Sequence, residues 1–67
     1  MIAKVVVKSG KPTPNGREMK MQLRMGAEGT GRIIQEIIYW PWSRQSVDAA
    51  TEIMRSAAKF AGVNIIW

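Results

Sequence analysis

Cysteine and histidine are both absent from this chain of 67 residues. Without cysteine the chain has no disulfide bond and no thiolate metal site, and without histidine it lacks the commonest general base and the commonest metal ligand. The acidic residues Glu36, Asp48 and Glu52 are too few and too scattered to form a paired acid–base site or a divalent-metal site. We therefore predict a protein that is not an enzyme and that holds no metal and no cofactor.

Long hydrophobic runs are missing as well. The longest apolar runs span only a few residues, whereas a membrane-spanning helix needs about 20. No charged and then apolar leader precedes a cleavage site of small residues. We expect neither a transmembrane segment nor a signal peptide, and a cytoplasmic location is the default expectation.

The chain is short for a protein that has to bury a core. Its length predicts a single small domain over residues 1–67, and a domain of this size buries only about 60% of the surface that the unfolded chain exposes. Hydrophobic residues nevertheless make up 46% of the sequence. This excess indicates either a dense core or apolar surface that a second copy or a partner covers.

Acidic residues are almost missing from the first 25 positions, where Glu18 is the only one. This span accounts for the whole formal net charge of +5, because the rest of the chain carries equal numbers of acidic and basic residues. A one-sided basic surface attracts polyanions and steers their approach. The basic residues of this span are Lys4, Lys8, Lys11, Arg17, Lys20 and Arg24.

Two stretches in the same span predict a β-hairpin. Residues 2–9 are rich in β-branched side chains, and residues 17–25 alternate strictly between apolar and polar side chains. Residues 10–16 hold two prolines, two glycines and an Asn-Gly pair, which favour a long loop with a basic tip. The alternation directs the methionines of the second strand to one face and its cations to the other.

The pairing of the two strands follows from packing and charge. A register in which opposing residue numbers add up to 26 places Val7 opposite Met19 and Lys8 opposite Glu18. A shift of one residue would turn every methionine to water. We therefore expect this register.

Residues 32–40 allow two interpretations. Their isoleucines recur at a helical spacing, but four isoleucines, a tyrosine and a tryptophan in nine residues favour a strand, which we predict. We expect the odd-numbered residues from Ile33 to Tyr39 to face inward, because the opposite phase would bury Glu36, which costs more than burying Gln35.

A helix is the most clearly predicted element. Ser43 or Ser46 offers an N-cap, Asp48 complements the helix dipole in the first turn, and apolar residues recur at a helical spacing as far as Ala61. Gly62 is placed to end the helix in the left-handed conformation. The many alanines permit a close approach to a sheet.

These elements predict an α+β fold. We expect a three-stranded antiparallel β-sheet in the order β-β-β-α, with the amphipathic helix packed on one face. The apolar residues 63–67 form a short C-terminal strand or tail, which docks either as a fourth edge strand or in a contact between subunits.

The face of the sheet away from the helix is the candidate site. It combines basic side chains with aliphatic ones and with an aromatic, as in sheets that bind single-stranded nucleic acid. Charged side chains also keep exposed strands soluble, which is the plainer interpretation. The candidate nucleic-acid-binding residues are Lys4, Lys8, Lys11, Arg17, Lys20, Arg24 and Trp42. Of the three tryptophans, we expect two to be buried or interfacial and Trp42, which follows Pro41, to be free.

The leading hypothesis is a small basic protein that binds DNA or RNA with low sequence specificity through its N-terminal hairpin. The alternative is an interaction or inhibitor protein, of the kind that phages and mobile elements carry, that binds an acidic protein surface. In either case we expect no membrane partner. A homodimer, packed through the edge of the third strand or through the outer face of the sheet, would account for the apolar excess.

Overall fold

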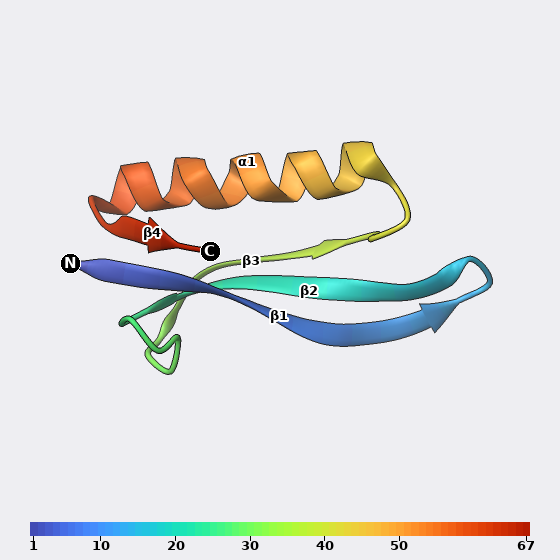
Figure 1. Ribbon diagram of the computed structural model, residues 1–67, viewed down its shortest axis with the longest axis horizontal. Helices are drawn as coiled ribbons and strands as arrows, with labels where there is room; N and C mark the ends of the chain where they lie inside the picture. Colours follow the sequence, from blue (N-terminus) through green and yellow to red (C-terminus); the bar gives the residue numbers. More distant parts are fainter.

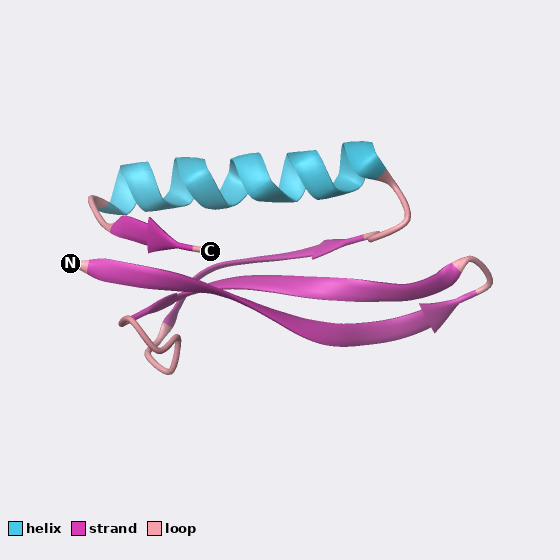
Figure 2. Cartoon of the chain, in the orientation of Figure 1, coloured by secondary structure: helices cyan, strands magenta, loops and turns pink.

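Four strands and one helix make up the chain, and the computed structural model describes all residues from Met1 to Trp67. Along the sequence these elements are β1 (Ile2–Thr13), β2 (Gly16–Met25), β3 (Ile33–Tyr39), α1 (Arg44–Ala61) and β4 (Asn64–Ile66). The strands form one sheet in the order β3-β2-β1-β4, and α1 covers only one of its faces (Figures 1 and 2). The helix lacks the length and the apolar character needed to span a bilayer.

The predicted α+β class is confirmed, but the sheet has four strands and is mixed. The hairpin β1–β2 and the pair β2–β3 are antiparallel, whereas β4 runs parallel to β1. Gly62 ends α1 in the left-handed conformation, with a φ of 71°, as expected. The chain then turns back along β1, where the backbone N–H of Asn64 donates to the carbonyl of Met1 at 2.8 Å.

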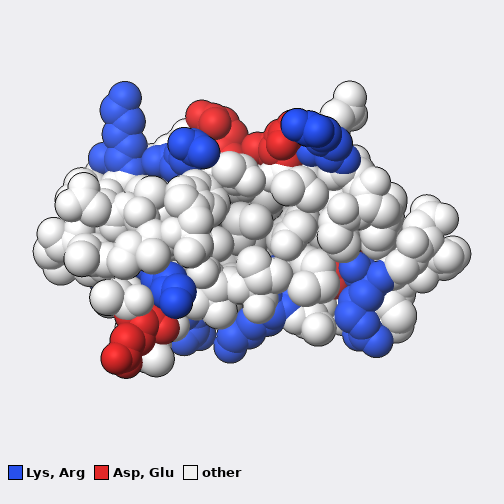
Figure 3. Space-filling model, in the orientation of Figure 1, with Lys and Arg blue, Asp and Glu red and all other residues white.

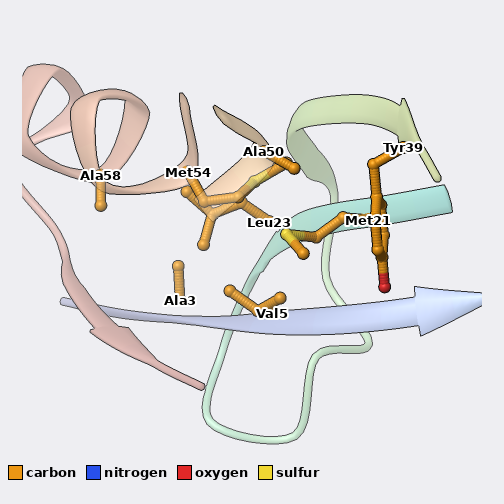
Figure 4. Close-up of a cluster of buried hydrophobic side chains, with 8 residues drawn as sticks. All are labelled: Ala3, Val5, Met21, Leu23, Tyr39, Ala50, Met54 and Ala58. Atoms are coloured by element: carbon orange, nitrogen blue, oxygen red, sulfur yellow. The ribbon is translucent and has the colours of Figure 1, made fainter. Parts of the chain in front are cut away.

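The core lies between α1 and the central strands. Leu23 and Met54 are its largest fully buried side chains, and Ala50 and Ala58 bring the helix close to the sheet (Figure 4). The predicted inward direction of the methionines on β2 is confirmed, because Met21 is buried and its neighbours in the alternation pack against the core. Val7 was expected in the core but is 46% exposed, since β1 moves away from α1 along its second half (Figure 1).

The expected hairpin register is wrong by two residues. Lys8 lies opposite Lys20, and Val7 lies opposite Met21, so the residue numbers of partners add up to 28 over most of the ribbon. A shift of two residues leaves every side chain on its predicted face, and for this reason the alternation could not detect the error.

The predicted long loop at 10–16 is also wrong. β1 continues to Thr13, a register irregularity falls between Ser9 and Pro12, and only Pro14 and Asn15 form the turn. The Thr13 hydroxyl donates to the carbonyl of Gly16 at 2.6 Å and accepts from the backbone N–H of Asn15 at 3.3 Å, which closes the turn. The shorter connection is what moves the register.

Residues 33–39 form a strand and not a helix, as predicted. Its phase is correct from Gln35 onward but wrong before it, because the pairing with β2 shifts between Leu23 and Arg24. Ile33 lies opposite Arg24 and is 42% exposed, whereas Ile34 packs against the core. The irregularity places one extra residue on β3, so Ile33 faces outward and Ile34 faces inward, the reverse of what was expected.

Of the two candidate N-caps of α1, Ser43 is the one used. Its hydroxyl accepts a hydrogen bond from the backbone N–H of Ser46 at 3.3 Å. The Ser46 hydroxyl instead accepts from the backbone N–H of Trp40 at 2.8 Å, which ties the start of the helix to the end of β3. The expectation for Asp48 is wrong, since the first turn holds no acidic residue. Asp48 instead pairs with Arg44 at 3.8 Å, where both side chains are exposed.

Candidate nucleic-acid interface

The side of the sheet away from α1, called the outer face below, carries the cations of both hairpin strands. Because side chains alternate along a strand, the residues next to the buried Val5 and Leu23 point away from the helix. Figure 3 shows mostly basic side chains along the side of the molecule opposite α1, with acidic side chains at its left end, and a separate mixture of both signs over the helix. The outer-face cations are Lys4, Lys8, Lys20 and Arg24.

These four cations are cross-strand partners of one another. Lys4 lies opposite Arg24, and Lys8 lies opposite Lys20. Directly opposed residues have Cβ atoms only about 4.5–5.5 Å apart, and like charges in these positions destabilise the pairing. The expected neutralisation of Lys8 by Glu18 does not occur, because Lys20 occupies the partner position.

None of these four cations forms an ion pair with a carboxylate. The single ion pair joins Arg44 and Asp48 on α1, on the other side of the sheet. Two acidic residues lie on β2 and β3, Glu18 and Glu36, but neither is within 4.0 Å of a cationic nitrogen. By alternation Glu18 and Glu36 share the outer face with the four cations, so this face keeps a net positive charge that is available to an external anion.

A buried glutamine separates the two cationic pairs. Gln22 is only 5% exposed, and it lies between Val6 on β1 and Glu36 on β3. Its Nε2 donates to Oε2 of Glu36 at 2.6 Å, and its Oε1 accepts from Nε of Arg24 at 3.0 Å. Gln22 was not among the residues predicted for the site, although its position between Lys20 and Arg24 on β2 was a signal. This network fixes the direction of the Arg24 guanidinium.

The connection between β2 and β3 folds back onto the outer face. Gly29 is buried, with a φ of +70°, and a Cβ built on it would come within 2.6 Å of a methyl carbon of Val6. The same position would lie 3.5 Å from Cβ of Lys4, so the connection packs on the aliphatic stem of this lysine. Residues 26–32 thereby cover one end of the outer face, a cover that the alternation of the strands did not predict (Figure 1).

The other end of the ribbon projects past β3 and α1 and carries the remaining predicted cations (Figure 1). Lys11 and Arg17 are both exposed there. The guanidinium of Arg17 donates to the carbonyl of Gly10 at 2.8 Å, which holds it against the irregular part of β1. Both cations lie beside the turn at Thr13–Gly16, called the hairpin tip below, although alternation along β2 places Arg17 on the face opposite to Lys20.

All three tryptophans are partly exposed, so none of them is buried within the chain, and the expectation of two buried or interfacial tryptophans would need an interface to hold. Trp40, Trp42 and Trp67 are exposed by 51%, 43% and 49% respectively. Trp42 is partly exposed, and one part of its ring packs on the hairpin tip, where a Cβ on Gly16 would lie 3.2 Å from Cε3. The ring of Trp67 instead lies 5.3 Å from the guanidinium carbon of Arg55 on α1.

An aromatic cavity lies between the hairpin tip and the segment that follows β3. It has a volume of about 370 Å³ and is lined by Thr13, Asn15, Trp40 and Trp42. Its two indole rings and its amide are groups that stack on and hydrogen-bond to planar polar ligands. The fold therefore brings Trp42 to the same end of the ribbon as Lys11 and Arg17.

Comparisons with models of protein families, with curated proteins and with solved structures found no match to this chain.

Proposed function

We propose that the protein binds nucleic acid through the outer face and the hairpin tip. The observation that supports this most directly is the placement of like charges opposite each other, Lys4 against Arg24 and Lys8 against Lys20, with no ion pair to a carboxylate. Such an arrangement costs stability in the free protein. A polyanion that enters between the opposed cations removes this cost, and the released counterions favour the complex.

The spacing of the two cationic pairs suits an extended backbone. Lys8 follows Lys4 by four positions along β1, which is about 13 Å at the rise of an extended strand. Gln22 fills the position between the pairs with a side chain that is already hydrogen-bonded inside the chain. The cations therefore contact phosphates, while the middle of the face offers no free group for reading bases.

The hairpin tip adds a place for stacking. Trp40 and Trp42 line the cavity of about 370 Å³, at the end of the ribbon that carries Arg17. Stacking of a base on an aromatic ring is worth about 1–3 kcal/mol and tolerates any base. Phosphate contacts position a protein without reading sequence, so the proposed binding has low sequence specificity and favours unpaired bases at the tip.

The experiment is a titration of labelled single-stranded DNA, duplex DNA and RNA by fluorescence anisotropy, at about 50 mM and about 200 mM salt. We expect micromolar or tighter binding that weakens steeply as salt is added. In the double variant K8Q/K20Q, two phosphate contacts are lost. The negative slope of log affinity against log salt should become shallower by about 1.4 for single strands and by about 1.8 for duplex.

The matched control is R44Q/R55Q, which removes the same charge from α1. Arg44 and Arg55 are exposed on the opposite side of the sheet. The control should retain the wild-type salt slope, because neither residue contacts the phosphates. Equal losses in both double variants would show that only the net charge matters, and the outer face would then not be the binding site.

An acidic protein surface is the second candidate. It is favoured by the exposed aliphatic side chain of Ile38, which is 54% exposed and lies opposite Lys20 on the outer face. Lack of binding to every oligonucleotide at about 50 mM salt would reject the first proposal. An acidic protein would then be the class of partner to test, with the same two double variants.

A further inference from the structure

The flank of the molecule formed by β3 and α1 carries an apolar groove outside the proposed nucleic-acid interface. The groove has a volume of about 540 Å³, and its apolar lining includes Ile34 from β3 and Ile53, Ala57 and Phe60 from α1. Phe60 is 96% exposed, the highest value among the large hydrophobic side chains. No part of the chain covers this flank.

β3 forms the free edge of the sheet beside the groove. It pairs with β2 on one side only, and its other side has no partner strand. Alternate residues of such an edge present unpaired backbone N–H and C=O groups. With seven residues, β3 is longer than the opposite edge strand β4, which has three. The edge and the groove together form one surface with both hydrogen-bonding and apolar groups.

The same side of α1 shows the spacing of a helix–helix seam. Ala49, Ile53, Ser56 and Phe60 follow one another at intervals of four, three and four residues. This spacing places the four side chains in one stripe, as at the a and d positions of a coiled coil. Small residues alternate in it with large ones, so the stripe offers both a projecting ring and the space to receive one.

We propose that a second copy of this chain occupies the flank, with β3 paired antiparallel to β3 of the partner and α1 packed antiparallel on α1 of the partner. In a twofold arrangement about Ser56, Phe60 of each copy enters the groove of the other beside Ile53. A twofold interface requires a surface that complements itself. The stripe meets this requirement because the twofold rotation about Ser56 brings Phe60 of one copy to the groove beside Ile53 of the other copy.

The dimensions of the two layers agree with each other. Paired strands lie about 4.8 Å apart, which places β3 about 2.4 Å and β2 about 7.2 Å from the twofold axis. Packed helices lie about 8–10 Å apart, so each helix axis lies about 4–5 Å from the same axis. That position is above the space between β3 and β2, and α1 packs against both of these strands. Sheet pairing and helix pairing are therefore possible at the same time.

The charges beside the seam complement each other in this arrangement. Glu52 and Lys59 are seven residues apart and border the same side of the stripe, and both are exposed. In an antiparallel pair, equivalent borders of the two helices meet, so Glu52 of one copy lies beside Lys59 of the other, and the reverse. Charged residues that border a helical seam set the orientation of its partners. In a parallel pair the opposite borders of the two helices would meet, so Glu52 and Lys59 would not face each other.

Sedimentation velocity and light scattering of the purified chain test the proposal. The wild-type protein should have about twice the chain mass of 7.5 kDa. Phe60→Gln should raise the dimer dissociation constant by about tenfold or more, which corresponds to about 1.4 kcal/mol. Because Phe60 is exposed, the variant monomer should keep the wild-type circular dichroism spectrum.

A charge-reversal series identifies the contact and its orientation. Glu52→Lys and Lys59→Glu should each weaken the dimer, and the double variant E52K/K59E should restore it. Asp48→Lys is the matched control, since it makes the same charge change on α1 outside the seam and should leave the dimer unchanged. A wild-type protein that stays monomeric, or a dimer that none of these changes weakens, overturns the proposal. Neither result depends on nucleic-acid binding, which is measured separately.

Discussion

Lys8 affects both the stability of the free protein and the proposed binding of nucleic acid. It is exposed and lies opposite Lys20 in the hairpin, and neither lysine forms an ion pair with a carboxylate. Its side chain therefore lowers the stability of the free protein while it supplies charge to the outer face. A substitution that relieves the repulsion should improve the fold and impair the binding.

The variant Lys8→Glu tests this relation. An opposite-charge pair with Lys20 in place of a like-charge pair should raise the free energy of unfolding by about 0.5–1 kcal/mol, measured by urea denaturation. The affinity for an oligonucleotide should fall in the same protein.

Lys11→Glu is the control for Lys8→Glu, because Lys11 is exposed on the same strand in the irregular part of the register. It changes the net charge equally without removing a directly opposed pair of like charges. If both variants were stabilised to the same extent, the effect would come from the net charge and not from the pairing of Lys8 with Lys20.

The β2–β3 connection determines how much of the outer face is open. Gly29 and Gly62 both adopt a left-handed φ, of +70° and +71°, but only Gly29 has neighbours within contact distance. The close approach of Gly29 to Val6 holds the connection on the sheet. Gly62 ends α1 with open space around its Cα hydrogens. A comparison of substitutions at the two glycines therefore separates the cost of a left-handed backbone from the cost of a steric clash.

Alanine at each of these glycines should give different losses. Gly62→Ala should cost about 1–2 kcal/mol from the left-handed conformation alone. Gly29→Ala should cost clearly more, because its new methyl group also meets the side chain of Val6 at 2.6 Å. Urea denaturation of both variants measures the difference. Equal losses would mean that the connection does not pack on the outer face.

Some elements follow from local sequence, and others do not. The end of α1 at Gly62 was predictable because a left-handed glycine at that point leaves a local signal. The register of β1 and β2 was not, since it depends on which residues form the turn, and the prolines and glycines of residues 10–16 favoured a longer loop than the observed turn at Pro14 and Asn15. The irregularity at Ile34 was not predictable either, because it appears only when β3 is aligned with β2.

The candidate site was predicted only in part, because local patterns determine some of its features and contacts between distant segments determine the others. Alternation places the four outer-face cations on one side of the sheet, and a register shift of two residues does not change this placement. These cations are Lys4, Lys8, Lys20 and Arg24. The burial of Gln22 and the cover by Gly29 required the paired strands and the returning connection. The contact of Trp42 with the hairpin tip joins segments far apart in the sequence, and no local pattern indicates it.

The molecule as a unit has a small core for its surface. Only 10 of its 67 residues are buried, and the molecule extends over 39 × 21 × 14 Å. A chain of this size seldom gains more than about 3–5 kcal/mol from a single core. Pairing of the β3 and α1 flanks would bury Phe60 and the groove, and it would add stability that the monomer lacks.

Stability should therefore depend on protein concentration. A dimer that forms only from folded chains stabilises them by mass action. The urea midpoint of the wild-type protein should rise over a roughly hundredfold increase in concentration, whereas the midpoint of Phe60→Gln should stay constant. A wild-type midpoint that does not change would place the protein among monomers, whatever its affinity for oligonucleotides.

The amino-acid order alone determined the α+β class, the single amphipathic helix and the common face of the hairpin cations. These properties follow from periods of 3.6 and 2 residues, which act between near neighbours in the chain. The tertiary structure decided the register that opposes Lys8 to Lys20, the parallel position of β4 and the free edge of β3 beside the α1 groove. These features depend on how distant segments of the chain meet. Several registers and strand orders keep the same side chains on each face, and only the pairing energies between strands distinguish them.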